Sequence, residues 1–193
     1  MIEINLPVSE EQIRSLNVGD EVSINGIMVT GRDTAHTWMI DEKPDDIRDL
    51  LQNSILYHCG PVVKQENGEY SFVAAGPTTS IREEPYQGDV IKEYGIRGVI
   101  GKGGMGEKTL QALKDFGAVY LHAVGGAATI LAQSVKKVHG VFKLEEFGVP
   151  EAMWVIEVQG FKAVVTMDSN GASLHSHVKS KSEVVAKKLI GID

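Results

Sequence analysis

Hydrophobic and polar residues recur with helical spacing in the first third of the chain. Ser9 and Gln12 have the spacing of a helix capping box before apolar residues, so we expect a short helix to begin there. The same spacing predicts helices at 34–41 and 45–52. Pro44 lies between them, where it ends the first helix and can open the second.

Two Asn-Gly dipeptides lie between runs of alternating polar and apolar residues, and both predict β-hairpins. Asn-Gly accepts the two positive φ angles of a type I′ turn, which joins neighbouring antiparallel strands. Residues 21–30 alternate around Asn25-Gly26. A second hairpin is expected around Asn67-Gly68.

The middle of the chain predicts a β-α-β unit. The apolar stretch 98–100 favours a strand, 107–116 has the spacing of an amphipathic helix, and 118–121 is again apolar. Another helix is expected at 129–138, after a second glycine-rich turn.

The last part of the chain returns to strands before a Lys-rich tail. Residues 153–158 and 163–167 predict strands, and 178–190 has the spacing of an amphipathic helix. Strands, helices, a β-α-β unit and further strands, in this order, predict a mixed α/β (α+β) fold with flanking helices on a partly barrel-like sheet. We expect one domain over residues 1–193, because the sequence has no long linker or internal repeat.

The charge balance limits the kinds of ligand. The 193 residues include 26 Asp and Glu against 19 Lys and Arg, so a wide basic face for phosphate backbones is not expected. This disfavours nucleic acid as a partner. Any anion site must be local, built from a few cations and backbone N–H groups, which points to a small anion.

The sequence also predicts a cytoplasmic location. No apolar run approaches the roughly 20 residues that a membrane-spanning helix needs. The first residues, Met1-Ile2-Glu3, lack the basic and apolar segments of an export signal. We therefore expect a soluble protein with no membrane partner.

Cys59 is the only cysteine. One thiol cannot form an internal disulfide, a Cys-rich zinc site or a three-thiolate iron–sulfur cluster, so a cluster would have to come from a partner. A lone cysteine in an apolar setting is more often a buried small hydrophobe than a nucleophile. We assign Cys59 no chemical role.

The glycine-rich segment 101–106 lies between a predicted strand and a predicted helix. It satisfies the Gly-x-Gly-x-x-Gly dinucleotide pattern, but residues 120–123 offer no acidic group for the ribose, so we reject a nicotinamide cofactor. Glycines, a helix start and Lys102 together suit a carboxylate. The alternative is a tight β-to-α turn with a solvated Lys102.

Two further segments combine hydroxyls and cations. Residues 76–82 (Gly-Pro-Thr-Thr-Ser-Ile-Arg) suit carboxylate or phosphate binding, although a Ser/Thr helix cap followed by a surface Arg82 is the commoner arrangement for such a segment in isolation. At 30–36, Arg32 and Asp33 precede His36, where a capped helix with an Asp–His pair is the simpler interpretation. His36 has no local companions that would complete a metal site.

His175 and His177 alternate after Leu174. Because no matching cluster of ligands accompanies them, we expect a polar strand edge here rather than a metal site.

Taken together, these segments resemble the beta subunit of the iron–sulfur class of fumarate hydratases and of tartrate dehydratase, which corresponds to the C-terminal domain in one-chain forms. The resemblance is ordered and spans nearly the whole chain. It is carried by Leu16-x-Val18-Gly19-Asp20, Gly31-Arg32-Asp33-x-Ala35-His36, Gly60-Pro61-Val62-Val63, Gly76-Pro77-Thr78-Thr79-Ser80-x-Arg82, the 101–106 segment and Gly148-x-Pro150-Glu151-x-Met153-Trp154-Val155.

The resemblance implies a hydro-lyase that interconverts fumarate and (S)-malate, a reaction of the tricarboxylic acid cycle. It implies Thr78 as the group that moves a proton at carbon. The implied substrate-binding residues are Arg32, Arg82, Lys102, Gly103 and Gly104. It also implies a swivelling β/β/α-type domain and a four-iron four-sulfur cluster held by an alpha subunit, with no metal ligand and no cofactor on this chain.

Other interpretations stay open at this stage. The chain fits a tartrate dehydratase beta subunit equally well in its motifs, and a non-catalytic domain that binds small dicarboxylates would need no partner for turnover. The motifs do not fix the stoichiometry of a heteromer or whether the chain also forms a homodimer. A threonine hydroxyl is a poor base at neutral pH, so Thr78 would need a proton acceptor, which we expect on the other subunit.

Overall fold

A ring of five strands forms the centre of the computed structural model, which describes residues 1–191. The strands are hydrogen-bonded in the order β2-β3-β6-β7-β9, and β9 returns to pair with β2. They are β2 (Glu21–Thr30), β3 (Ile55–Tyr57), β6 (Gly98–Gly101), β7 (Val119–His122) and β9 (Met153–Met167). β1 (Ile2–Asn5) adds to β2 and β8 (Val135–Phe142) adds to β9, while β4 (Val62–Glu66) and β5 (Glu69–Ala74) form a separate hairpin.

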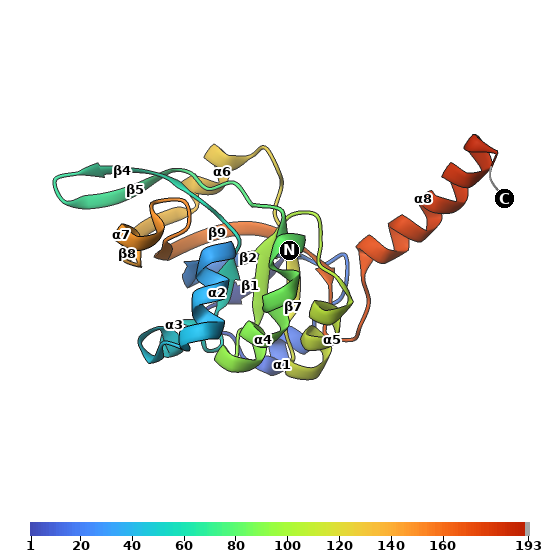
Figure 1. Cartoon of the computed structure of the whole chain (residues 1–193), viewed down its shortest axis with the longest axis horizontal. Helices are drawn as coiled ribbons and strands as arrows, with labels where there is room; N and C mark the ends of the chain where they lie inside the picture. The colour runs from blue at the N-terminus through green and yellow to red at the C-terminus, as the bar shows by residue number, and fades with distance from the viewer. Residues whose placement is uncertain (192–193) are drawn as a thin grey trace.

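Helices pack against the outside of the ring, and two segments, the last helix and the β4–β5 hairpin, project from it. The helices are α1 (Glu10–Arg14), α2 (Asp33–Glu42), η1 (Asp45–Ile47), α3 (Arg48–Leu51), η2 (Ser80–Glu83), α4 (Glu84–Tyr94), α5 (Glu107–Phe116), α6 (Ala128–Gln133), α7 (Leu144–Phe147) and α8 (Leu174–Ile190). Helices α2, α4 and α5 lie beside the sheet, whereas α8 and the β4–β5 hairpin project at opposite ends (Figure 1). The expected mixed α/β fold with a barrel-like sheet and flanking helices is confirmed.

Four strands of the ring run parallel, and this decides where polar loops collect. β2, β3, β6 and β7 are parallel neighbours, while β9 is antiparallel to both β2 and β7. The carboxyl ends of parallel strands lie at one edge, where α/β folds bind their ligands. We call this edge, where the four parallel strands end, the mouth of the ring.

The apolar core follows the two-residue period of the strands. Ile55 and Tyr57 of β3 belong to the apolar cluster inside the ring, which we call the inner cluster. Leu56, between them, packs outward against the helices α2 to α4. In β6, Ile100 faces the inner cluster, whereas Val99 packs outward in a second cluster with residues of α4 and α5. The ring is therefore filled by side chains and is not an open channel.

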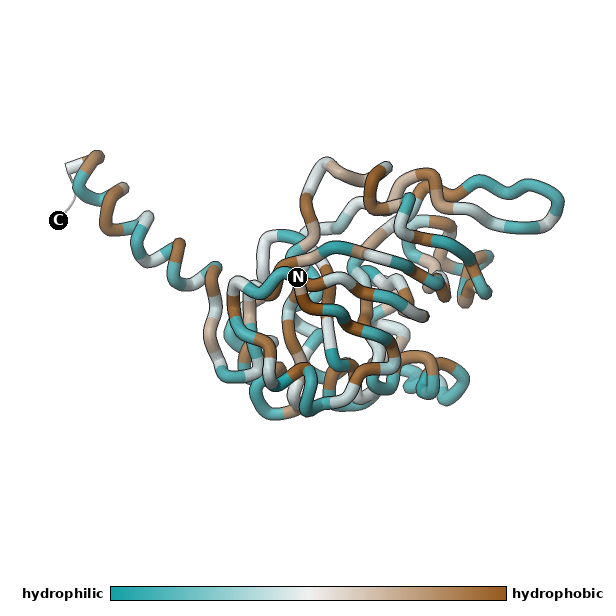
Figure 2. Tube along the Cα trace, turned by 180° about the vertical axis from the view of Figure 1, so that it is seen from behind, coloured by the Kyte–Doolittle hydropathy of each residue, from teal (hydrophilic) through white to brown (hydrophobic). Residues whose placement is uncertain are grey.

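Hydropathy varies along the projecting segments. The turn of the β4–β5 hairpin is hydrophilic, and α8 alternates between hydrophilic and hydrophobic residues (Figure 2). In the part of the chain that the structure describes, none of the helices combines the length and the apolar character needed to cross a membrane.

Several local predictions are confirmed. Oγ of Ser9 accepts from the backbone N–H of Gln12 at 3.2 Å, as in a capping box. The hairpin at Asn67-Gly68 has φ angles of 51° and 85°, and pairs β4 with β5. The predicted β-α-β unit is β6, α5 and β7, with parallel strands.

Three predictions were wrong, each because tertiary pairing overrides a local signal. Residues 21–30 form one strand, β2, with an irregularity at Gly26, where Oδ1 of Asn25 accepts from the backbone N–H of Gly160 at 2.8 Å. The predicted helix at 129–138 ends as α6 at Gln133, and its second half belongs to β8, which pairs with β9. The two predicted strands after 153 are one long strand, β9.

Phe161 of β9 tests the filled ring. Its side chain is fully buried and meets Tyr57 edge to face with ring centroids 5.2 Å apart. Phe161→Ala should lower the free energy of unfolding by about 3–5 kcal/mol, because it leaves a cavity among packed neighbours. Chemical denaturation measures this. The exposed Val185→Ala serves as the control and should change stability by less than about 0.5 kcal/mol.

Candidate functional site

The segment after Gly76 is held between two loops of the mouth by backbone hydrogen bonds. The N–H of Thr78 donates to the carbonyl of His58 at 2.7 Å, and the carbonyl of Thr78 accepts from the N–H of Lys102 at 3.1 Å. The N–H of Ser80 then donates to the carbonyl of Lys102 at 3.0 Å. Thr78 and Lys102, far apart in sequence, therefore lie on neighbouring backbones.

Arg32 follows β2 and stands before the first residue of α2. Its Nη2 lies 3.2 Å from Oε1 of Glu151 in an ion pair, and its buried Nε has no hydrogen-bond partner among the described residues. The guanidinium passes over Gly60, where an added Cβ would be 2.6 Å from Nη1. Glycine is thus required at position 60 for this close approach.

Arg82 connects the 76–82 segment to the Arg32 loop. Its half-exposed guanidinium forms an ion pair with Asp33, the first residue of α2. Arg32 and Arg82 are therefore both charge-compensated within the chain, by Glu151 and Asp33 respectively. Each ion pair occupies Nη2 of its guanidinium, so other N–H groups of both arginines remain open to a carboxylate ligand.

The glycine-rich loop presents Lys102 and two glycines with positive φ. Gly103 and Gly104 have φ of 84° and 80°, a conformation that side chains other than glycine rarely adopt. The ring of His175 covers Gly104, since an added Cβ there would lie 2.5 Å from it. Lys102 makes no ion pair within residues 1–191, and its side chain is half-buried.

The start of α5 is already capped by a side chain of this chain, so fewer N–H groups remain for the predicted anion site. Glu84 accepts hydrogen bonds from the backbone N–H of Gly106 at 2.7 Å and of Thr109 at 3.1 Å, and from the Thr109 hydroxyl at 2.7 Å. The helix start that the sequence offered to a ligand therefore binds an internal carboxylate. The groups left for an anion are Lys102 and the backbone of Gly103 and Gly104.

A buried carboxyl group, Glu83, neighbours the partly exposed Asp33 that pairs with Arg82. Glu83 is fully buried, and burial raises its pKa to about 9, with a further contribution from the neighbouring Asp33. The hydrogen bond from Glu83 in turn lowers the pKa of Asp33. At neutral pH, Glu83 is thus protonated and Asp33 is the anion that pairs with Arg82.

A chain of buried polar side chains lies between the mouth and the helices α2 and α4. Nε2 of His36 and Nε2 of His58 lie 2.9 and 2.7 Å from the amide of Gln87. Nδ1 of His58 contacts Oγ of Ser80 at 2.9 Å, and Ser80 contacts the hydroxyl of Tyr120 at 2.8 Å. Burial lowers the pKa of both histidines, so both are neutral at pH 7.

Sequence reasoning missed most of this chain. Gln87, His58 and Tyr120 were not singled out, because their contacts span 22 to 51 positions in the sequence and leave no local pattern. His36 was noted, but its partner was expected to be Asp33 rather than Gln87. The only available signal was polar residues in otherwise apolar stretches.

Cys59 is buried, and burial raises the pKa of its thiol to about 12. It is therefore a neutral thiol at physiological pH. Within residues 1–191, the structure has no group of three or more His, Cys, Asp or Glu side chains that could hold a metal ion.

His175 and His177 lie on the first turns of α8, so the predicted polar strand edge was wrong. Nε2 of His175 contacts the hydroxyl of Thr166 at 2.9 Å, and its ring is 6.1 Å from that of His122. His175 thereby ties the start of α8 to β9 next to the glycine-rich loop.

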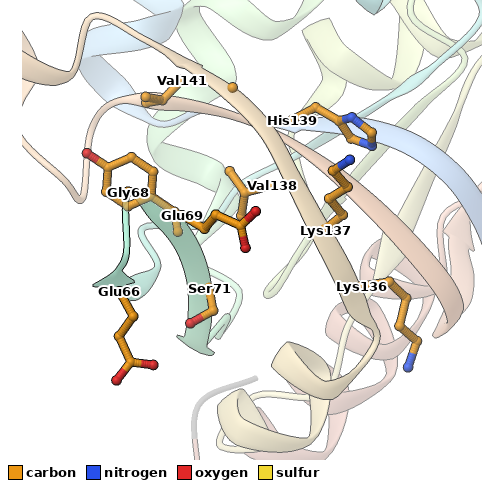
Figure 3. Close-up of a pocket in the computed structure, with 11 residues that line it drawn as sticks. Glu66, Gly68, Glu69, Ser71, Lys136, Lys137, Val138, His139 and Val141 are labelled. Atoms are coloured by element: carbon orange, nitrogen blue, oxygen red, sulfur yellow. The ribbon is translucent and has the colours of Figure 1, made fainter.

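A groove of about 600 Å³ lies elsewhere on the molecule, between the β4–β5 hairpin and β8. Lys137 and His139 extend from β8, and Glu69 extends from the hairpin opposite them (Figure 3). None of the residues at the mouth line this groove. Its size alone does not make it the site, because the cations and glycines of the sequence motifs gather at the mouth.

The protonated Glu83 predicts a pH dependence of stability. Unfolding lets Glu83 relax from a pKa of about 9 to its ordinary value of 4.5, so between these values the unfolded state releases a proton and the free energy of unfolding falls as pH rises. Glu83→Gln is permanently neutral and should lose about 1–3 kcal/mol less between pH 5 and pH 8 than the wild type. Denaturation at both pH values measures this, and parallel curves would contradict a buried proton.

Comparison with known proteins gives consistent matches. The family model described as "Fumarase C-terminus" matches residues 1–178. A putative fumarate hydratase class I of Geobacillus stearothermophilus is 58% identical over 184 residues, which is 94% of this chain but 35% of that protein. The chain thus spans about a third of that relative's length.

Two relatives are matched over most of their own length. A putative L(+)-tartrate dehydratase subunit beta of Methanocaldococcus jannaschii is 40% identical over 188 residues, or 96% of both chains. The L(+)-tartrate dehydratase subunit beta of Escherichia coli is 33% identical over 172 residues, which is 89% of this chain and 85% of the relative.

Proposed function

Since the chain belongs to the fumarase C-terminus family, we propose that it is the beta subunit of a hydro-lyase that interconverts fumarate and (S)-malate. The observation that carries the proposal is the backbone pairing of Thr78 with Lys102 beside Arg82, because it joins the motif segments at one edge of the ring. This edge combines cations for two carboxylates with a hydroxyl for proton transfer.

The dicarboxylate is bound by Arg32, Arg82 and Lys102. Guanidinium groups match carboxylates with two parallel hydrogen bonds, and Lys102 adds a third charge that is not committed to an ion pair within residues 1–191. The substrate carboxylates bind the guanidinium N–H groups that the ion pairs with Glu151 and Asp33 leave open. The N–H groups of Gly103 and Gly104 supply further donors to the anion.

Thr78 transfers the proton at carbon. In the hydration direction, water adds its oxygen to one alkene carbon and a proton reaches the other, which is next to a carboxylate. The charge that develops on that carboxylate is stabilised by Lys102 and the glycine-rich loop. In the reverse direction the Thr78 hydroxyl removes this proton and passes its own to an acceptor, because an alcohol is a weak base at neutral pH, and in hydration the same partner group returns a proton to Thr78. We expect this group on the other subunit.

An alpha subunit supplies the iron–sulfur cluster. Cys59 is the only cysteine and is a buried neutral thiol, so the donor set of this chain does not fit a cluster. Lewis-acid activation of water or of the malate hydroxyl is the chemistry that the cluster supplies when bound. Three exposed apolar side chains support a covering partner: Ile81 in η2, Val124 after β7 and Ile130 in α6.

Tartrate is the second candidate substrate. It is favoured by the relatives named tartrate dehydratase subunit beta, which this chain matches over 96% and 85% of their length. The higher identity of 58% to the fumarate hydratase relative favours fumarate. Both reactions use the same carboxylate-binding residues.

Reconstitution tests the assignment. The chain is produced anaerobically with and without a candidate cysteine-bearing alpha subunit, and iron content and activity on fumarate, malate and tartrate are measured. We expect activity on fumarate and malate only in the assembled protein, because the cluster and the proton acceptor lie on the partner. Dicarboxylate binding by the chain without turnover in any assembly would instead indicate a non-catalytic binding domain.

A pair of adjacent threonines tests the proton-transfer role. Thr78→Val keeps the side-chain shape but removes the hydroxyl, so it should lower kcat of the assembled enzyme by roughly 10²–10⁴ with little change in KM. Thr79→Val is the matched control and should leave kcat within a few-fold. Equal losses in both variants, or a change in KM alone for Thr78→Val, would move the role away from Thr78.

A further inference from the structure

The hydrogens of the buried polar chain can be traced from one fixed acceptor. Nδ1 of His36 lies 2.8 Å from the carbonyl oxygen of Arg32. A carbonyl oxygen only accepts hydrogen bonds, so Nδ1 of His36 must carry a hydrogen. This hydrogen on Nδ1 of His36 determines where the other hydrogens of the buried polar side chains lie.

His36 is neutral in this setting. Its ring is fully buried, and its two ring nitrogens contact only uncharged groups, the carbonyl of Arg32 and the amide of Gln87. A neutral imidazole with hydrogen on Nδ1 has a bare Nε2, which can only accept. Gln87 must therefore donate to it across the 2.9 Å contact.

This requirement fixes the orientation of the Gln87 amide. In the structure its oxygen faces both rings, and its buried Nε2 has no partner. A half-turn of the amide exchanges oxygen and nitrogen without moving other heavy atoms. The two N–H bonds then reach Nε2 of His36 and of His58, and only a carbonyl oxygen is left unpaired. With the amide oxygen facing the rings instead, His36 would need hydrogens on both nitrogens, which would bury an imidazolium beside an unpaired NH₂ group. The rotated amide costs less free energy.

We propose that Gln87 is a positioning residue whose amide N–H groups hold His36 and His58 as Nδ1–H tautomers. His36 then donates to the carbonyl of Arg32, and His58 donates to Oγ of Ser80. Ser80 lies between Thr78 and Arg82 in the segment at the mouth. One amide on α4 thereby fixes the loop of Arg32 and the segment of Thr78 and Arg82 relative to each other.

Ring nitrogen spectra test the proposal directly. Long-range ¹H–¹⁵N correlation spectra of the full chain at pH 7 distinguish protonated from bare ring nitrogens. We expect hydrogen on Nδ1 and a bare Nε2 for both His36 and His58. Ser80→Ala should perturb Nδ1 of His58 alone, which assigns that ring. A hydrogen on Nε2 of either ring, or a doubly protonated His36, would overturn the proposal.

Gln87→Glu reverses the donor. A carboxylate only accepts, so Nε2 of His36 and of His58 should gain hydrogen, whereas Gln87→Met removes the polar contact and controls for volume. Unchanged ring patterns in Gln87→Glu would contradict the assigned role. That Gln87 positions residues for turnover rests on the proposed function, whereas its effect on the histidine tautomers does not. If the expected tautomers are found in a protein that is inactive in every assembly, the hydro-lyase assignment fails and the role of Gln87 stands.

Discussion

The pairing of β9 with β2 closes the sheet, and the arrangement of the mouth depends on this closure. β9 contacts β2, β7 and β8 along its length, so one strand joins the first and last parallel strands of the ring. β2, β3 and β6 are parallel hydrogen-bonded neighbours and therefore end beside one another, while β9 joins β2 and β7 at the two sides of this set. The loops that follow them carry Arg32, His58 and Lys102. Backbone geometry brings these residues to one edge despite the repulsion between the like charges of Arg32 and Lys102.

The charged side chains at the mouth compensate one another, which lowers the free-energy cost of partly burying them. Two arginines are compensated by Glu151 and Asp33, while Glu83 avoids a further buried anion by keeping its proton. The helix start that could attract a second anion is occupied by Glu84. A dicarboxylate bound as proposed would meet arginines that the folded chain already holds in place through ion pairs.

Residue types and short motifs predict much of the mouth but not the network behind it. The segments 76–82 and 101–106 are visible in the sequence because glycines, hydroxyls and cations are adjacent there. Gln87 gives no such signal, since it looks like any polar residue on an amphipathic helix until α4 packs against His36 and His58. The same limit explains the strand at 21–30, where Asn25-Gly26 forms an irregularity because β9 lies opposite.

Closure by a late strand sets the order in which this molecule can mature during translation. Every residue proposed to contact the substrate, from Arg32 to Gly104, leaves the ribosome before β9 at Met153–Met167. A nascent chain without β9 can therefore pair β2, β3, β6 and β7 with one another, but the sheet that carries these groups stays open between β2 and β7. Ribosome-bound intermediates shorter than this expose the edges of β2 and β7 that β9 later covers, and such open edges can pair with other chains.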